Sequence, residues 1–251
     1  MGLIVKNKGK WKPSKYVNTR GELVATENLK ELGVGSRLIA NITAEYYDHH
    51  IKKYAKGKLL DLGCGKVPLF AAYRRRVTSN VCVDWEHSSH EHRYADYEYD
   101  IEEGLRFEDE EFDTIILSDV LEHIRRPLKL WNEMSRVLSK GGTILLNVPF
   151  YYWIHEEPYD YHRYTEFALR DFAQSCGLKI IVLDAIGGIP EILTDILAKN
   201  ILWFPILGRS IAVFVQKAAL SFRRTAFGKR LSLKTSRNFP FGYFVVAQKD
   251  L

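Results

Sequence analysis

Aromatic and ionisable residues are interleaved between positions 147 and 165, where the aromatic density is far above the average of the chain. A typical small-molecule pocket has apolar walls and a few polar groups that fix the orientation of the ligand. An imidazole, a carboxylate and a guanidinium are suited to that orienting role. The segment therefore predicts a ligand pocket with His155, Asp160 and Arg163 as polar groups and Phe150, Tyr151 and Tyr159 as walls.

A glycine-rich turn follows the apolar run 58–62, which is typical of a strand buried on both faces. Glycine lets the backbone turn tightly and approach a ligand closely. The helical pattern that starts near Leu69 places a helix N-terminus beside this turn, and helix N-termini favour anionic groups. The dinucleotide fingerprint is incomplete, because Pro68 occupies the position of its third glycine. We therefore predict a site for a nucleotide-like cofactor at Asp61, Gly63, Cys64 and Gly65.

Two further apolar runs end in side chains that could reach the same cofactor. The run 80–85 contains Asp84, 19 residues after Gly65, which is near the spacing of about 20 at which a carboxylate binds ribose hydroxyls. The run 112–119 ends in a serine and an aspartate. Ligands of open parallel sheets bind at the carboxyl ends of the strands. The expected cofactor contacts from these runs are Asp84, Trp85, Ser118 and Asp119.

Four segments together resemble the motifs of class I S-adenosylmethionine-dependent methyltransferases of type 11, the ubiquinone/menaquinone-biosynthesis-like family. They are DLGCG at 61–65, YDI at 99–101, FDTIILSDVLEHI at 112–124 and LSKGG at 138–142. The resemblance covers about 56–186 and 240–248. It implies S-adenosyl-L-methionine as the cofactor, with Asp100 and Ile101 at its adenine. It also implies an α/β fold: a Rossmann-like, doubly wound seven-stranded sheet with an antiparallel last strand and a helical insertion before it.

The chemistry implied by the resemblance is attack of a nucleophile on a sulfonium methyl group, where alignment supplies most of the catalysis. His155 is the expected base or orienting group, because a neutral imidazole titrates near working pH. Asp160 and Arg163 would hold the substrate or His155 itself, and His123 would also contact the substrate. The pattern H-x-x-P-Y-D-x-x-R-Y-T at 155–165 resembles a type 11 subgroup of surface-polysaccharide and related small-molecule pathways. We expect methyl transfer, at oxygen, to a small-molecule or a glycan- or lipid-linked acceptor.

A metal-assisted reaction on a quinone precursor is the alternative. Asp119, Glu122 and His123 resemble the Glu-x-x-Glu-His metal ligands of the O-methyltransferases of ubiquinone synthesis, with Asp in place of the first Glu. Mg²⁺ held there would acidify a catechol hydroxyl. The polar loop HSSHEH at 87–92 is a weaker metal candidate, because no second ligand cluster lies near it in the sequence.

The net charge of +5 conceals basic ends and an acidic middle. Residues 1–20 carry six Lys and Arg and no acid, and residues 201–251 carry nine and one, so the other 180 residues carry 21 basic and 30 acidic groups. Basic ends indicate an anionic partner such as lipid headgroups, nucleic acid or a phosphorylated carrier, or else solubilising tails. A nucleic-acid methyltransferase is disfavoured, because no N/D-P-P-Y/F segment follows the apolar run 112–119, the fourth strand by comparison with the family. A non-catalytic binding module is disfavoured by the intact cofactor motifs.

Three regions are expected. Residues 1–55 form a basic arm followed by helices from about 22 to 54. Residues 56–186 with 239–251 form the cofactor-binding core, and residues 187–238 form an insertion with two amphipathic helices. The uncharged runs of the insertion are shorter than the ~20 residues that span a bilayer. It is therefore a lid, a homodimer surface or a membrane-surface element. Scattered cysteines and the lack of an apolar stretch in residues 1–15 favour a cytoplasmic, at most peripherally membrane-bound protein.

Overall fold

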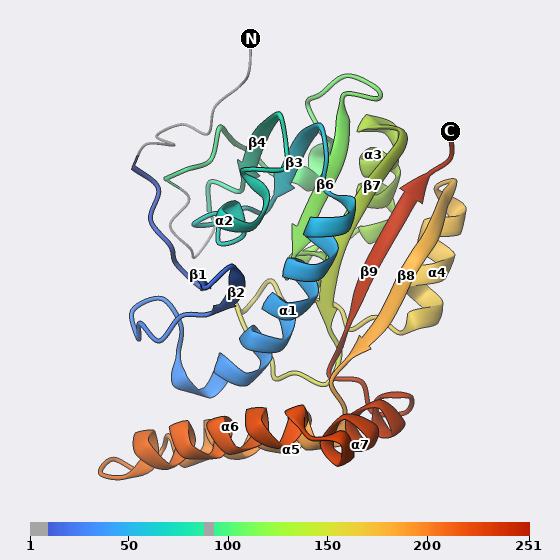
Figure 1. Ribbon diagram of the computed structural model, residues 1–251. Coiled ribbons are helices and arrows are strands. Elements are labelled where there is room, and N and C mark those ends of the chain that lie inside the picture. Colours follow the sequence, from blue (N-terminus) through green and yellow to red (C-terminus); the bar gives the residue numbers. More distant parts are fainter. Residues whose placement is uncertain (1–9, 88–92) are drawn as a thin grey trace.

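The computed structural model describes residues 10–87 and 93–251 (Figure 1). Two sequence-based interpretations fall partly outside the described residues. These are the first part of the basic arm, with Lys6 and Lys8, and the histidine-rich loop, with His90 and His92.

Seven strands form the central sheet, in the order β5-β4-β3-β6-β7-β9-β8. The five strands from β3 to β7 are parallel, whereas β9 runs antiparallel to both of its neighbours, β7 and β8. The predicted fold class is confirmed, including the antiparallel last strand and the helical insertion before it. The strands are β3 (Lys58–Leu62), β4 (Ser79–Asp84), β5 (Tyr97–Glu98), β6 (Phe112–Ser118), β7 (Leu138–Pro149), β8 (Leu178–Ile186) and β9 (Gly242–Lys249).

Helices cover both faces of this sheet. On one face lie α1 (Arg37–Tyr54) and the short α2 (Phe70–Tyr73), and on the other lie α3 (Pro127–Val137) and α4 (Glu166–Ser175) (Figure 1). Each side has its own apolar core, so the central strands are buried on both faces. This double burial explains why these strands read as continuous apolar runs rather than alternating ones. Trp131 of α3 is the largest fully buried side chain.

The N-terminal region differs from the expected basic arm and helix. Residues 16–25 form an antiparallel hairpin of β1 (Tyr16–Thr19) and β2 (Glu22–Ala25), and the long helix begins only at Arg37. Arg20 and Gly21 both have positive φ, as a tight two-residue hairpin turn requires. The prediction of an irregular arm up to residue 20 and a helical pattern from 22 was wrong here, because buried Tyr16 and Leu23 anchor a hairpin instead.

The insertion contains three helices, one more than predicted: α5 (Ile189–Ile201), α6 (Gly208–Arg224) and α7 (Ala226–Ser236). They lie across the end of the sheet at which the parallel strands finish (Figure 1). Buried Gln216 attaches α6 to the core, because its side chain accepts from Leu38 N at 2.5 Å and donates to Val34 O at 2.7 Å. None of the helices in the described part of the chain is long and apolar enough to cross a membrane.

Gln216→Ala tests this attachment. The change leaves the buried Leu38 N–H without its partner, which costs about 1–3 kcal/mol. It also removes one of the two hydrogen bonds that Val34 O accepts, the other coming from Arg37 N. We expect a lower free energy of unfolding in urea titrations of Gln216→Ala, and a change within about 0.5 kcal/mol for the exposed neighbour Lys217→Ala. Equal stability of the two variants would mean that α6 is not held to the core through this side chain.

Candidate active site

A cavity of about 720 Å³ opens at the carboxyl ends of β3, β4, β6 and β7. Most of the predicted cofactor residues meet there although they are far apart in the sequence. This cavity is large enough for a nucleoside cofactor together with part of an acceptor. The predicted residues that line it are Gly63, Cys64, Gly65, Asp84, Trp85, Asp100, Ile101, Ser118, Asp119, Glu122, His123, His155 and Tyr159.

The glycine turn after β3 has the shape of a ligand cradle. Gly63 has φ of +65°, and a Cβ at this position would collide with the side chain of Val120. Gly65 has φ of +49° with open space around its Cα. Asp84 fastens the turn, because its carboxylate accepts from Gly65 N and from Trp85 N, the latter at 2.7 Å. Each carboxylate oxygen has a second lone pair. Asp84 can therefore still accept hydroxyl groups of a ribose.

Asp61 does not line the cavity. Its buried carboxyl accepts from Tyr73 Oη at 3.1 Å, beneath the turn. Burial raises the pKa of Asp61 to about 7, against the opposing effect of the Tyr73 hydrogen bond. A direct contact of Asp61 with the cofactor stays a prediction. The geometry supports a role in positioning the turn.

Asp100 and Trp85 border the side of the cavity next to β4. Asp100 caps the short 3₁₀ helix η3 (Ile101–Glu103) by accepting from Glu102 N at 2.8 Å. The rings of Trp85 and Tyr159 meet edge to face, with centroids 5.0 Å apart. These groups offer an aromatic wall and a carboxylate to a purine, so the cofactor implied by the sequence fits the residues present.

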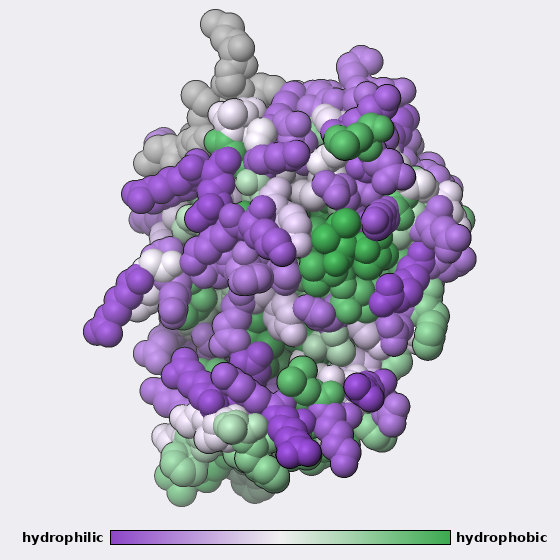
Figure 2. Space-filling view, turned by 45° about the vertical axis from the view of Figure 1, so that its right-hand side comes forward, coloured by the Kyte–Doolittle hydropathy of each residue, from purple (hydrophilic) through white to green (hydrophobic). Residues whose placement is uncertain are grey.

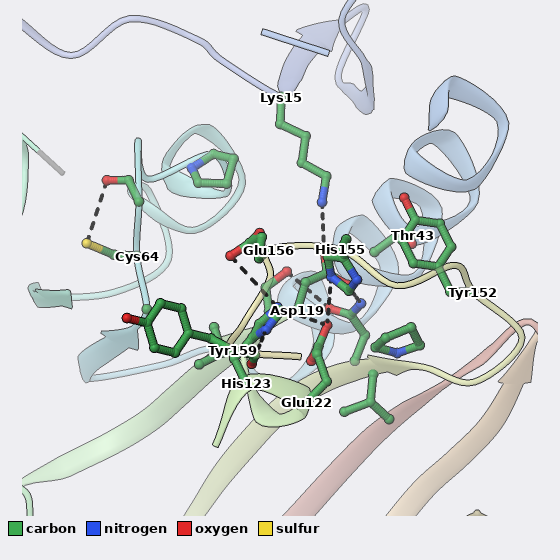
Figure 3. A pocket seen from close by; sticks show the side chains of 18 of the residues that line it. Lys15, Thr43, Cys64, Asp119, Glu122, His123, Tyr152, His155, Glu156 and Tyr159 are labelled. Atoms are coloured by element: carbon green, nitrogen blue, oxygen red, sulfur yellow. Dashed lines mark hydrogen bonds and ion pairs between the residues drawn. The ribbon is translucent and has the colours of Figure 1, made fainter. Parts of the chain in front are cut away.

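Asp119 lies at the end of β6 and is held by two protein groups. Lys15 Nζ is 2.7 Å from Asp119 Oδ2 (Figure 3). The Asn147 amide donates to Asp119 Oδ1. Burial opposes both charges, but their attraction prevails: the pKa of Lys15 is raised and that of Asp119 is lowered. Lys15 was missed by sequence reasoning. It was one lysine among several in the expected arm, and only the β1–β2 hairpin places it at the sheet.

Three ionisable side chains cluster deeper in the cavity (Figure 3). Glu122, in the 3₁₀ helix η4 (Leu121–His123), is fully buried, and neither of its carboxylate oxygens has a hydrogen-bond partner within the described residues. His123 Nε2 and His155 Nε2 each lie 3.9 Å from Glu122 Oε1. Burial, reinforced by the charge of Asp119, raises the pKa of Glu122 well above its ordinary value. Burial and His123 lower the pKa of His155.

Asp160 and Arg163 stand behind His155 and do not line the cavity. Arg163 forms a two-point ion pair with Asp160, at 2.5 and 2.7 Å. Asp160 Oδ2 also accepts from His155 N at 3.0 Å and lies 3.2 Å from His155 Nδ1. Burial opposes ionisation of Asp160, but Arg163 outweighs it and lowers the pKa of Asp160 to about 2. This geometry suits the pair to the positioning of His155, and contact of either residue with a substrate stays a prediction.

The aromatic walls are partly different from those predicted. Phe150 packs against the core beside Tyr243, and Tyr151 faces Phe239, so neither lines the cavity. Tyr152 lines it instead, edge to face with His155 at a centroid distance of 5.2 Å. The high aromatic density indicated that this segment borders the cavity, but it does not indicate which of its rings point into the cavity.

The cavity could also hold a metal ion, although not with the predicted ligands. Ligand atoms of Glu122, His123 and His155 all lie within 4.8 Å of one another. The predicted set of Asp119, Glu122 and His123 is not the one that the structure brings together, because Lys15 and Asn147 occupy Asp119. Two imidazoles and one carboxylate suit Zn²⁺ or a similar transition metal better than Mg²⁺, which prefers oxygen ligands.

Residues 60–146 match the model of the methyltransferase domain family Methyltransf_11. The match spans strands β3 to β7, about a third of the chain, and makes this stretch similar to a methyltransferase domain. Its fold is similar to that of the [4+2]-cyclase SpnF, with a TM-score of 0.55 at 15% identity over 95% of this chain and 88% of that one. It is also similar to an S-adenosylmethionine-dependent methyltransferase from Mesorhizobium loti, with a TM-score of 0.53 at 12% identity over 84% and 100% of the two chains. At these identities the two structures show the fold alone.

A curated relative matches a shorter stretch. An uncharacterized protein of Methanocaldococcus jannaschii is 44% identical over 46 residues, which are 18% of this chain and 22% of the relative. The methyltransferase domain family implies S-adenosylmethionine as the cofactor, in agreement with the cradle after β3 and the carboxylates at the strand ends.

Asp84→Ala tests the cofactor site. Loss of the carboxylate leaves the ribose hydroxyls without their acceptor, which costs about 1–3 kcal/mol, or roughly 5- to 150-fold in affinity. Calorimetric titration with S-adenosylhomocysteine measures the loss. Asp96→Ala is the matched control, because Asp96 accepts from Cys82 N within the same region but does not line the cavity. Unchanged affinity in a folded Asp84→Ala protein would remove Asp84 from the site.

Proposed function

We propose that this protein transfers the methyl group of S-adenosylmethionine to a hydroxyl group of a small-molecule or a glycan- or lipid-linked acceptor, with His155 accepting the proton. The observation that carries the proposal is the position of His155. It lines the same cavity as the glycine cradle, and the Asp160–Arg163 pair fixes its backbone and faces its ring.

The cofactor half of the site would be formed by the turn at Gly63–Gly65 with Asp84 and Asp100. When bound, S-adenosylmethionine supplies an electrophilic methyl group on a sulfonium. The acceptor half would be formed by Tyr152, His155 and Tyr159, whose rings exclude water and limit the acceptor's orientations. Holding the acceptor oxygen in line with the methyl group is the main catalytic task, because positioning accounts for several kcal/mol in such reactions.

His155 is suited to take the acceptor proton. Its pKa is lowered, so the ring is neutral at neutral pH. A proton on Nδ1 would face the carboxylate of Asp160, 3.2 Å away, and would leave Nε2 free to act as the base. Because its own pKa is about 2, Asp160 stays ionised and stabilises the imidazolium that forms. A carboxylate acceptor needs no base, so this arrangement favours a hydroxyl.

His155→Gln tests the base. We expect kcat to fall by about 10²- to 10⁴-fold, measured as transfer of labelled methyl to a panel of phenols, catechols and sugars. Binding of S-adenosylhomocysteine should change little. His162→Gln, in the same segment but outside the cavity, should keep its activity.

The pH profile provides a second readout. Burial lowers the pKa of His155, and His123 and Arg163 lower it further, whereas Asp160 and Glu156 oppose this in part. The rate should therefore be lost as pH falls through a value below the ordinary 6.5, and this acidic limb should disappear in His155→Gln. An acidic limb that persists in His155→Gln would assign the base elsewhere.

Metal-assisted O-methylation is a second candidate, favoured by Glu122. Glu122 is a fully buried carboxylate without a hydrogen-bond partner among the residues that the structure describes, and two imidazoles flank it. These three groups are a donor set for a divalent transition metal. A metal held there would lower the pKa of an acceptor hydroxyl, and His155 would then be a ligand rather than a base.

Chelation separates the two candidates. With His155 as a free base, exhaustive dialysis against EDTA should leave methyl transfer unchanged. With a metal, dialysis should abolish transfer, and Zn²⁺ or Mn²⁺ should restore it better than Mg²⁺. Glu122→Gln removes a ligand with little change in volume and should then prevent restoration. Calorimetric titration of the dialysed protein with Zn²⁺ detects the site without need of an acceptor.

A further inference from the structure

The turn between α5 and α6 exposes large apolar side chains to solvent. We call residues 202–207, with the sequence LWFPIL, the α5–α6 tip. Trp203 is 85% exposed and Ile206 is 89% exposed, and Leu202, Phe204 and Leu207 are exposed as well. Such a contiguous apolar surface is rare on a soluble monomer and indicates an interaction site.

The exposed apolar surface continues along both helices of the insertion. On α5, Leu193, Ile196 and Leu197 are exposed at helical spacing, so they share one face. On α6, Ile211, Phe214 and Phe222 form a similar stripe. Figure 2 shows apolar side chains along the lower edge of the molecule, beside strongly hydrophilic ones. The α5–α6 tip is thus the end of a longer apolar surface, which we call the insertion face.

The charges around the insertion face have one sign. Between positions 196 and 238 the chain contains nine Lys and Arg and no Asp or Glu. Arg209, Arg224 and Lys229 are exposed next to the apolar residues. Three basic residues are already paired: Lys199 with Asp195 at 2.6 Å, Lys217 with Glu27 at 3.7 Å and Arg223 with Glu45 at 2.6 Å. The Arg223 pair helps to hold α6 on α1. The basic residues are Lys199, Arg209, Lys217, Arg223, Arg224, Lys229, Arg230, Lys234 and Arg237.

Two other occupants fit the insertion face less well. A lid over the acceptor would line the cavity, but none of the cavity-lining residues in the described chain falls within 187–238. A second copy related by a two-fold axis would bring the same patch to both sides of the interface. Since positions 196–238 hold no acidic residue, that contact would oppose basic groups to basic groups.

We propose that the insertion face docks this protein on an anionic lipid bilayer without crossing it. The apolar residues of α5, α6 and the tip would enter the boundary between headgroups and acyl chains, and the basic residues would bind anionic headgroups. The face is amphipathic, and its tip presents Trp203 next to a uniformly basic segment. This is the composition that an interfacial helix pair requires, and neither charge nor apolar surface alone would provide it.

Docking would bring residues 147–165, which we call the acceptor segment, to the bilayer. Lys199 Nζ of α5 lies 3.8 Å from the ring centroid of Tyr152 and 4.7 Å from that of Trp153. Trp153 and Ile154 are themselves exposed, beside the insertion. The apolar surface therefore extends from the insertion face to the segment that lines the cavity.

Co-sedimentation of the full chain with vesicles tests the proposal. We expect binding to phosphatidylglycerol vesicles in about 0.01 M salt, weaker binding in about 1 M salt, and little binding to phosphatidylcholine vesicles. The combined change of Arg209, Arg224 and Lys229 to Gln should weaken binding roughly a hundredfold. The change of Trp203 and Ile206 to Ser should also weaken binding strongly. Docking requires both the basic and the apolar residues of the insertion face, so each variant must bind vesicles more weakly than the wild-type protein.

Matched controls distinguish docking through the insertion face from non-specific binding to vesicles. The basic control changes three exposed residues outside the insertion to Gln, and vesicle binding should stay almost unchanged. These residues are Arg75, Lys140 and Lys179. Leu251→Ser is the apolar control, because Leu251 is fully exposed at the C-terminus, at the far end of the sheet from the insertion (Figure 1). Circular dichroism verifies that each variant is folded.

Three outcomes would overturn the proposal. The first is wild-type protein that stays in the supernatant with phosphatidylglycerol vesicles at low salt. The second is equal loss of binding in the insertion variant and in the basic control, which would mean attraction by net charge alone. The third is a dimer in light scattering that Trp203→Ser and Ile206→Ser dissociate, which would assign the face to a second copy. None of these results depends on methyl transfer, so they leave the proposed function untouched.

Discussion

The parallel alignment of β3, β4, β6 and β7 is the constraint on which the site depends. In this register Leu62 lies beside Val83 on one side and Leu117 on the other, and Ser118 lies beside Asn147. The residues that follow these positions therefore emerge at one edge of the sheet, where no further strand pairing is available. This alone brings the glycine turn, Asp84, Asp119 and the acceptor segment to one cavity. The loops that follow these strands can therefore differ in length and composition without changing the strand pairing.

Two carboxylates three residues apart show how the surroundings divide the roles within that cavity. Glu122 is fully buried and Asp119 partly buried, and burial opposes ionisation of both, yet the pKa of Asp119 is lowered and that of Glu122 is raised. The difference lies in their partners: Asp119 has the Lys15 ammonium and the Asn147 amide, and Glu122 has no hydrogen-bonding group within the described residues. Ionised Asp119 also makes ionisation of Glu122 more costly. A protonated Glu122 or a bound cation would each remove that cost.

The strands of the sheet were predicted well because the sequence patterns that indicate a strand lie within a few neighbouring residues. Buried parallel strands give apolar runs, and the glycine turn after Leu62 requires positive φ, so both leave a signal within a few residues. The β1–β2 hairpin was missed because its turn, Arg20-Gly21, is short and the surrounding charges suggested an arm. The third helix of the insertion, α7, was hidden in a run of basic residues.

The sequence predicted where the site lies more accurately than which side chains form it. A motif can indicate which strand ends meet, but not which side chains turn into the cavity. Tyr151 and Tyr152 are neighbours of one type, and only packing against Phe239 on one side and His155 on the other separates them. Similarly, the cation that neutralises Asp119 comes from a residue 104 positions away. Such long-range pairs leave no trace in a single sequence.

The acceptor segment connects the chemistry of the cavity to the surface of the insertion. On its inner side, Asp160 and Arg163 bind each other and hold the His155 backbone, which fixes the imidazole against the cavity. Arg163 also donates to Trp153 O at 3.1 Å, and Lys199 of α5 lies over the Trp153 ring. One continuous set of contacts therefore runs from His155 through Arg163 and Trp153 to the insertion. The contact with the insertion and the positioning of His155 thus belong to one stretch of the chain, residues 153–163.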